Sequence, residues 1–381
     1  MENELAAIIP AAGLSSRMGE LKALLPLGET TVLGHIIKLF QSCGISDIIV
    51  VTGHRAEEVE QEAVRAGARA VHNADYEQGM FTSIKTGIRA LRPETRGFFL
   101  LPVDIPLIRR GTIRLLAEAF TNFPLAIVYP VFHGRRGHPP LITTSLSKHI
   151  LNNDGPDGLR GLLEQVDRQS VTSVRDIEVP DANILFDMDT MTDYRSGIDL
   201  YAKRDMPTIE ECSILLHDLY GMAPLGLDHA QRVADLAAAI CAGIAEKRGQ
   251  GPDRDVCRVA GLLHDIAKGH AHHEEEGGRW LRQLGFDRVA DIVAAHKEAE
   301  LPPGARVTEK EIVYLADKMV SGNRLVSVEN RFRQKLELYA EDPAACAAIT
   351  RRLLQARKVM EAIEIETGCS LDYLISQCRD A

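Results

Sequence analysis

The chain has 381 residues, of which 45% are hydrophobic and 26% charged, and such proportions are typical of a globular protein with two domains. The formal net charge of −10 excludes a protein that binds nucleic acid through a general basic surface. No apolar run reaches the ~20 residues of a membrane-spanning helix, and acids stand at the start where an export signal has positive charge, so we expect a cytoplasmic protein without a membrane anchor.

The first element is an apolar run at residues 6–10, short enough to be a buried strand. The loop that follows, residues 11–19, contains two glycines, two serines and Arg17, and Lys22 comes shortly after it. Glycines let backbone N–H groups approach phosphate oxygens, and basic side chains neutralise the phosphate charge. The loop therefore predicts a phosphate site, although it matches neither the GxGxxG nor the P-loop pattern.

Strands and helices then alternate along the first half of the chain. Apolar runs predict strands at residues 47–52, 70–72 and 97–103, and amphipathic patterns predict helices at residues 31–43, 56–66 and 83–91. This alternation is typical of an α/β fold with a doubly wound, Rossmann-like, mostly parallel sheet. In such sheets ligands bind at the carboxyl ends of the strands.

Asp104 lies at one of these strand ends, between Pro102 and Pro106. A carboxylate there, facing a phosphate loop from another strand, could hold a Mg²⁺ ion that bridges protein and triphosphate. The alternative is that Asp104 caps a helix beginning at Gly111, but the flanking prolines and the distance along the chain disfavour capping.

The loop resembles the signature of the MobA-like nucleotidyltransferases, and most of all the molybdenum-cofactor cytidylyltransferases, whose loops read A-A-G-x-S-S-R-M-G-x-x-K. The resemblance implies that the loop wraps a nucleoside triphosphate. Arg17 and Lys22 would bind the phosphates, and Asp104 would bind the metal. The loop contacts with the nucleotide would come from Ala11, Ala12, Gly13, Ser15 and Ser16.

Four further segments resemble this family. Asn73, Gly79 and Ser83 match a nucleotide-binding segment. Two segments resemble the family's substrate-binding segments. Gly137 and His138 belong to a Gly-His-Pro loop, and Asp157 and Arg160 belong to a G-D-x-G-x-R turn that here contains the inserted Pro156. Asp187 and Asp189 match a closing D-x-D-T, where a second carboxylate would complete the Mg²⁺ site. On a strand the two would point to opposite faces, so only one could reach the metal, and we favour Asp189.

The resemblance implies that a phosphate of the acceptor attacks the α-phosphorus of the nucleotide and that pyrophosphate leaves. Nothing in the residues distinguishes CTP from GTP physically, but the Ser-Ser and Gly-His-Pro segments resemble the cytidylyl branch. The implied partners are CTP, a molybdopterin-type acceptor, and a molybdoenzyme or cofactor carrier that receives the product. A sugar-phosphate or alcohol-phosphate nucleotidyltransferase remains an alternative.

After Tyr194 the pattern changes to helical periodicity alone. Residues 201–207 are polar and end in proline, which predicts a linker between a transferase domain at 1–200 and an all-α domain with a helical C-terminal extension at 208–381. The helices of this domain are expected at residues 230–247, 257–267, 278–284, 290–295, 312–320 and 344–365.

The polar residues of this helical half include His229, the pair His264 and Asp265, and Asp317. Imidazoles and carboxylates from separate helices can converge on one divalent metal, and the adjacent pair could share an ion only at a helix turn where the side chains splay. A charged pair within the apolar run 262–266 is costly unless a metal or partner compensates it. Seven scattered cysteines without a CxxC pair exclude a cysteine-ligated metal site and favour reduced thiols.

This set resembles the HD-domain phosphohydrolases. The resemblance implies a metal such as Mn²⁺, Fe²⁺ or Mg²⁺ held by His229, His264, Asp265 and Asp317, with Lys268 near a substrate phosphate. His273 and His296 match positions of a second metal in some HD families, so one and two metals both stay open. We expect His217 and Asp218, a second His-Asp pair, to lie on a helix surface, and His270 and His272 to be solvated. An alternative is a nucleotide-sensing HD domain that regulates the transferase without catalysis.

Overall fold

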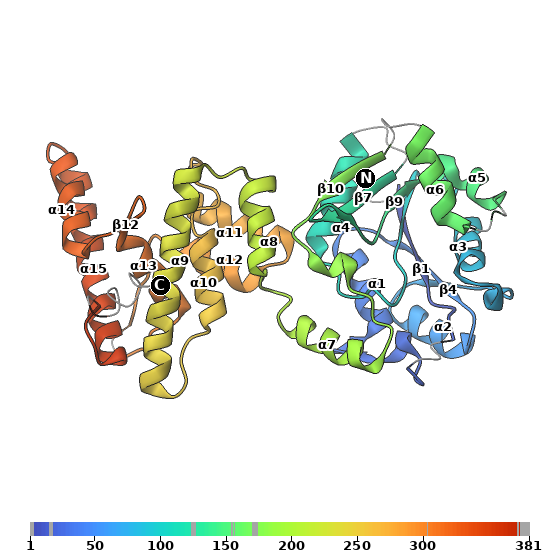
Figure 1. The fold of residues 1–381 in the computed structure, drawn as a ribbon, viewed down its shortest axis with the longest axis horizontal. Coiled ribbons are helices and arrows are strands. Elements are labelled where there is room, and N and C mark those ends of the chain that lie inside the picture. Colours follow the sequence, from blue (N-terminus) through green and yellow to red (C-terminus); the bar gives the residue numbers. More distant parts are fainter. Residues whose placement is uncertain are drawn as a thin grey trace. The chain divides into compact units, whose positions relative to one another are not determined.

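The computed structural model describes residues 4–14, 18–122, 127–153, 155, 157–169, 174–302, 304–371 and 373. The chain divides into two compact units, Met1–Arg204 and Asp205–Ala381, and each is described by itself (Figure 1). The last helix of the first unit, α7 (Met191–Ala202), includes the first two residues of the segment predicted as a linker.

A mostly parallel sheet forms the centre of the first unit (Figure 1). Its strands in spatial order are β10 (Val174–Glu178), β7 (Ile127–Phe132), β9 (Leu141–Thr143), β6 (Gly97–Leu100), β1 (Leu5–Pro10), β4 (Asp47–Thr52) and β5 (Arg69–His72), with β8 (Arg135–Arg136) paired to β7. The predicted doubly wound α/β fold is confirmed. None of the sequence patterns predicts β7, β8, β9 or β10, and β9 runs antiparallel to β6 and β7.

Helices cover both faces of the sheet because successive strand residues point to opposite sides. On β6, Phe98 packs in a core with Ile84 of α3, whereas the adjacent Phe99 contacts Phe40 of α1. The helices of this unit besides α7 are α1 (Val32–Ser42), α2 (Ala56–Arg65), α3 (Met80–Arg89), α4 (Arg110–Asn122), α5 (Ser147–Leu151) and α6 (Gly158–Gln169). A small hairpin, β2 (Pro26–Leu27) and β3 (Thr30–Thr31), precedes α1.

The strand predicted at residues 97–103 is shorter in the structure. β6 ends at Leu100, and the chain turns at Val103 and Asp104. Pro102 has no N–H group to donate on the side of β9, although Leu101 and Val103 still donate their N–H groups to Ile8 and Pro10 of β1. The turn places Asp104 just beyond the carboxyl end of β6.

The second unit is helical, as predicted, except for a hairpin of two-residue strands, β11 (Val320–Ser321) and β12 (Arg324–Leu325). Its helices are α8 (Ile209–Ile214), α9 (Pro224–Arg248), α10 (Arg254–Leu263), α11 (His273–Leu284), α12 (Asp287–Ala295), α13 (Glu309–Lys318), α14 (Val328–Leu338) and α15 (Pro343–Thr367). No helix in the described part of the chain combines the length and hydropathy that a membrane crossing requires.

Helices α9 and α10 approach each other so closely that only glycine fits at position 261. A Cβ atom there would lie 2.6 Å from Cα and 2.9 Å from N of Ala234. These are backbone atoms that cannot swing aside, so we expect Gly261→Ala to lower the free energy of unfolding of the second unit by about 1–3 kcal/mol, despite alanine's better helix propensity. Thermal unfolding of the full chain measures the change, and an unchanged or higher melting temperature would contradict this close contact.

Candidate functional site

The first unit has a pocket of about 370 Å³ beyond the carboxyl ends of β1 and β6. Its walls come from the loop after β1, the segment before and within α3, and the turn after β6. The lining residues are Pro10, Ala11, Ala12, Gly13, Leu14, Leu21, Lys22, Ala23, Tyr76, Glu77, Gly79, Met80, Ser83, Pro102, Val103 and Asp104. The structure therefore brings the predicted phosphate loop, Lys22 and Asp104 to one cavity.

The loop after β1 is held in place by backbone hydrogen bonds to β4 and to the segment that follows β4. Ala11 donates its N–H to Val51, and His54 donates its N–H to Ala12. A Cβ atom at Gly13 would meet no atom of the described residues within 4 Å. Ser15, Ser16 and Arg17, which the sequence assigns to the nucleotide, lie outside the described residues.

Lys22 lies between two carboxylates at the edge of the pocket. Its ammonium nitrogen is 2.6 Å from Asp189 Oδ1 and 3.9 Å from Asp104 Oδ2, and only 9% of the residue is exposed. Burial raises the pKa of Asp104, and the charge of Lys22 opposes this rise. A mostly buried lysine and a cluster of carboxylates suit a site for a phosphate with its divalent cation.

Three carboxylates meet here, and one expectation from the sequence is wrong. Residues 186–189 form no strand, and ligand atoms of Asp104, Asp187 and Asp189 all lie within 4.8 Å of one another. The buried Met188 donates its N–H to the Asp104 carbonyl oxygen, which anchors the segment while both flanking aspartates reach the cluster. Asp187 and Asp189 are therefore both candidate metal ligands; burial and then the two neighbouring carboxylates raise the pKa of Asp187.

Asp104 does not cap α4. The buried Asp181 holds the start of that helix, because its carboxylate accepts hydrogen bonds from the Arg109 N–H and the Thr112 hydroxyl. Asp104 is consequently left for the pocket.

The other matched segments differ in their distance from the pocket. Gly79 and Ser83 line it, whereas Asn73 lies behind and donates its amide to the Ser83 hydroxyl, 3.0 Å away. Asn73 is thus placed to position Ser83. Met80, which belongs to the same matched segment, also lines the pocket, and so does Tyr76, which the sequence pattern did not single out.

The acceptor-side residues do not line this pocket. His138 is half-buried beside Asp187, and this burial lowers the pKa of its imidazole. Gly137 packs against Ile184, where a Cβ atom would lie 2.4 Å from the carbonyl oxygen. Asp157 is exposed, and Arg160 pairs with Glu164 on its own helix.

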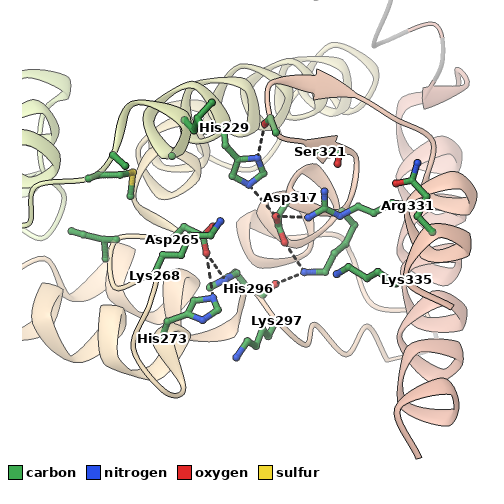
Figure 2. A pocket seen from close by; sticks show the side chains of 18 of the residues that line it. His229, Asp265, Lys268, His273, His296, Lys297, Asp317, Ser321, Arg331 and Lys335 are labelled. Atoms are coloured by element: carbon green, nitrogen blue, oxygen red, sulfur yellow. Dashed lines mark hydrogen bonds and ion pairs between the residues drawn. The ribbon is translucent and has the colours of Figure 1, made fainter. Parts of the chain in front are cut away.

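The second unit gathers imidazoles and carboxylates from several helices at a pocket of about 950 Å³ (Figure 2). His229 comes from α9 and Asp317 from α13, and α10 ends at Leu263, so the splayed turn predicted for the His264–Asp265 pair is present. α10 stops four residues before the predicted helix end. His273 begins α11, and His296 follows α12.

Three of these histidines are oriented alike. Nδ1 lies 3.0 Å from the Gly322 carbonyl oxygen in His229, 2.8 Å from that of Gly261 in His264 and 2.7 Å from that of Val293 in His296. Because a carbonyl only accepts, each Nδ1 carries a proton, which leaves Nε2 as the ring nitrogen that could bind a metal. This is the arrangement that metal-ligating histidines show in proteins.

The Nε2 atoms and carboxylates form two groups that share Asp265. Ligand atoms of His229, His264 and Asp265 lie within 4.8 Å of one another, and so do those of Asp265, His273 and His296. Asp317 Oδ1 joins the first group, 3.3 Å from His229 Nε2 and 3.7 Å from His264 Nε2. The residues present can therefore hold one ion or two.

The charge states also suit a metal. Burial lowers the pKa of His264, and it lowers that of His296 to about 4, so both imidazoles are neutral near pH 7. Burial would raise the pKa of Asp265, but His264 and Lys268 outweigh it and hold the pKa near 2. His264 Nε2 is buried and has no hydrogen-bond partner among the described residues. A divalent ion would satisfy this orphaned atom.

The histidines expected to lie outside the site do so. His217 and Asp218 are exposed on the segment Leu215–Leu219, and His270 and His272 are exposed as well. Lys268 lines the pocket and contacts Asp265 at 2.6 Å. Five further basic residues that belong to no sequence motif line the pocket: Lys297, Lys318, Arg331, Lys335 and Arg352.

Comparison with known proteins matches both halves of the chain. Residues 7–171 match the MobA-like NTP transferase domain, and residues 226–321 match the HD domain. The molybdenum cofactor cytidylyltransferase of Escherichia coli (strain K12) is 33% identical over 198 residues, which covers 51% of this chain and 96% of that protein. A probable molybdenum cofactor guanylyltransferase of Mycolicibacterium paratuberculosis is 28% identical, with coverage of 51% and 94%.

Among solved structures, a nucleotidyl transferase from Methanothermobacter thermautotroptrophicus is 25% identical, with a TM-score of 0.47 over 53% of this chain and 99% of that one. The sequence matches cover nearly the whole length of the cytidylyltransferase relative and a separate domain after it. The chain therefore belongs to the MobA-like NTP transferase family, as a nucleotidyltransferase of the cytidylyltransferase type that carries a C-terminal HD domain.

Proposed function

We propose that the first unit transfers CMP from CTP to a phosphate of a molybdopterin-type cofactor and releases pyrophosphate. The observation that carries the proposal is the pocket at which Lys22 and Asp104 meet the loop after β1. The choice of CTP and of the acceptor is supported by the relative named molybdenum cofactor cytidylyltransferase.

In this reaction an oxygen of the acceptor phosphate forms a bond to the α-phosphorus of CTP, and the bond to pyrophosphate breaks. The buried ammonium of Lys22 would contact the triphosphate and stabilise the negative charge that spreads over it. Backbone N–H groups near Gly13 would approach phosphate oxygens, and Ser83, held by Asn73, would contact the nucleotide. Asp104, Asp187 and Asp189 would hold Mg²⁺, which supplies further neutralisation of phosphate charge.

We propose that the second unit hydrolyses a phosphoester. His229, His264, Asp265 and Asp317 would hold one divalent ion such as Mn²⁺, Fe²⁺ or Mg²⁺, and His273 and His296 would join Asp265 at a second. Such ions supply an activated water and neutralise phosphate charge. Lys268 would contact the substrate phosphate once that phosphate replaces its present contact with Asp265.

Cellular placement forms part of the same proposal. The described cysteines are free thiols, which is consistent with a reducing compartment, and we propose that the protein acts in the cytoplasm. A molybdoenzyme or a cofactor carrier would then receive the cytidylylated cofactor.

The test is a panel of the four nucleoside triphosphates, each with and without molybdopterin cofactor and Mg²⁺, in which released pyrophosphate is measured. We expect release above background with CTP and cofactor together. Pyrophosphate release that requires a sugar phosphate or an alcohol phosphate in place of the cofactor would contradict the proposed acceptor. Greater release with GTP than with CTP would contradict the proposed nucleotide.

A further inference from the structure

The pocket of the second unit carries far more positive charge than its metal ligands need. Its lining includes two carboxylates, Asp265 and Asp317, whereas its basic residues are Lys268, Lys297, Lys318, Arg331, Lys335 and Arg352. This excess stands in a chain whose overall charge is −10. A volume of about 950 Å³ exceeds the need of a single phosphate, so the pocket suits a larger polyanion.

Half of these cations lie on the C-terminal helices. Arg331 and Lys335 stand one turn apart on α14, and Arg352 lies on α15. All three follow the HD-domain match, which ends at residue 321. Figure 2 shows Arg331 and Lys335 reaching from their helix toward the cluster of His229, Asp265 and Asp317. The C-terminal extension therefore builds one wall of the pocket.

The cations near the metal ligands already have close acidic partners. Lys268 lies 2.6 Å from Asp265, Lys318 lies 2.6 Å from Asp317, and Lys297 lies 2.5 Å from Glu274. These pairs neutralise the side of the pocket formed by α10 to α13.

The cations on α14 are less well neutralised. Arg331 approaches Asp317 only to 3.7 Å, and its buried Nε has no hydrogen-bond partner among the described residues. Lys335 is exposed to the pocket and pairs with no carboxylate in the described part of the chain; its ammonium lies 5.9 Å from the Phe332 ring. Partial desolvation, together with the positive charges of Arg331 and Lys318, lowers the pKa of Lys335. Such crowding of like charges is relieved when an anion binds.

The mouth of the same pocket is apolar. Leu225 and Leu338 line it and are 79% and 76% exposed. Exposed leucines at a pocket rim suit the organic part of a substrate better than a free inorganic ion.

We infer that Arg331 and Lys335 form a second phosphate subsite beside the metal-ligand cluster, and that the HD pocket takes an organic substrate with at least two adjacent phosphoryl groups. The inference rests on the proposed phosphohydrolase function. Water would add to the phosphorus held at the metal ligands, the phosphorus–oxygen bond to the leaving group would break, and the leaving oxygen would take up the proton that water loses. The phosphoryl group on Arg331 and Lys335 would stay intact and fix the orientation of the substrate.

The experiment compares AMP, ADP and ATP as probe substrates of the full-length, Mn²⁺-loaded protein. We expect kcat/KM for ADP and ATP to exceed that for AMP by about tenfold or more, as one lost charge-assisted contact would imply. Lys335→Ala should bring this ratio of kcat/KM values close to one, whereas Lys335→Arg should retain most of the preference. Arg333→Ala should leave the ratio at the wild-type value. Arg333 is the matched control, because it lies on the same helix, is exposed and bonds Asn330 outside the pocket.

Two failures are distinguishable. Hydrolysis with the same ratio in Lys335→Ala as in wild type would overturn the subsite and leave the phosphohydrolase assignment standing. If the wild-type protein instead hydrolyses none of AMP, ADP and ATP, the phosphohydrolase assignment is overturned. The subsite would then be tested by calorimetric titration with inorganic pyrophosphate. Both proteins would carry Lys22→Ala, which removes the phosphate contact of the first unit. Weaker pyrophosphate binding when Lys335→Ala is added would support the subsite, and equal binding would overturn it.

Discussion

Replacing Lys22 with alanine is expected to lower CTP-dependent pyrophosphate release by about 10²–10³-fold, the cost of removing one preorganised donor from a developing negative charge. Lys22 is buried at the wall of the nucleotide pocket and lies 2.6 Å from Asp189. Its removal leaves the cluster of Asp104, Asp187 and Asp189 without the ammonium group that contacts Asp104 and Asp189. The same change should therefore weaken binding of the triphosphate as well as slow its reaction.

The matched control is Lys38→Ala, which removes an exposed lysine from α1 that lines none of the pockets described. Pyrophosphate release and thermal unfolding should be measured on both variants. Wild-type release in Lys22→Ala would exclude this lysine from the phosphate site. A large drop in melting temperature would indicate that lost activity reflects lost folding, and Lys22→Arg would then separate charge from packing.

Asp265→Ala is expected to remove bound metal and to lower phosphoester hydrolysis at least ~10³-fold, because the metal supplies several kcal/mol of charge stabilisation. Asp265 is the single residue shared by both candidate ligand groups of the second unit. Its two oxygens face different partners, with Oδ1 3.2 Å from His273 Nε2 and Oδ2 3.6 Å from His264 Nε2. One substitution therefore empties either a one-metal or a two-metal site.

The chain offers its own control in the second His-Asp pair. Asp218 is exposed on the segment Leu215–Leu219, so Asp218→Ala should keep wild-type metal content and hydrolysis. Metal content by mass spectrometry and hydrolysis across a phosphoester panel measure both variants. Retained metal in Asp265→Ala would contradict the ligand assignment. If the wild-type protein binds metal but hydrolyses no phosphoester of the panel, the nucleotide-sensing alternative is favoured. The effect of Asp265→Ala on pyrophosphate release by the first unit would then test whether the HD domain regulates the transferase.

Local patterns predicted the parts of the protein that neighbouring residues determine. The apolar run at 6–10 forms most of β1, the glycine-containing loop follows it, and Asp104 follows β6. A parallel sheet brings such strand ends together. The histidines and aspartates of the second half stood out because apolar helices rarely carry them without a partner.

The rest depends on contacts that local patterns do not encode. Asp187 and Asp189 alternate as on a strand, yet Met188 anchors an irregular segment and both reach the cluster. The strands β7, β9 and β10 were not predicted, and the antiparallel pairing of β9 with β6 and β7 joins segments far apart in the sequence. Arg331 and Lys335 look like one face of any surface helix, and their role appears only when α14 lies beside Asp317.

The most direct test of the nucleotide site is a crystal structure of the full chain with CTP and Mn²⁺, in which the anomalous signal locates the metal. We expect Mn²⁺ on Asp104 with at least one of Asp187 and Asp189, and the triphosphate against Lys22 and the loop around Gly13. An ordered CTP whose phosphates contact neither Lys22 nor the metal on Asp104 would contradict the assignment.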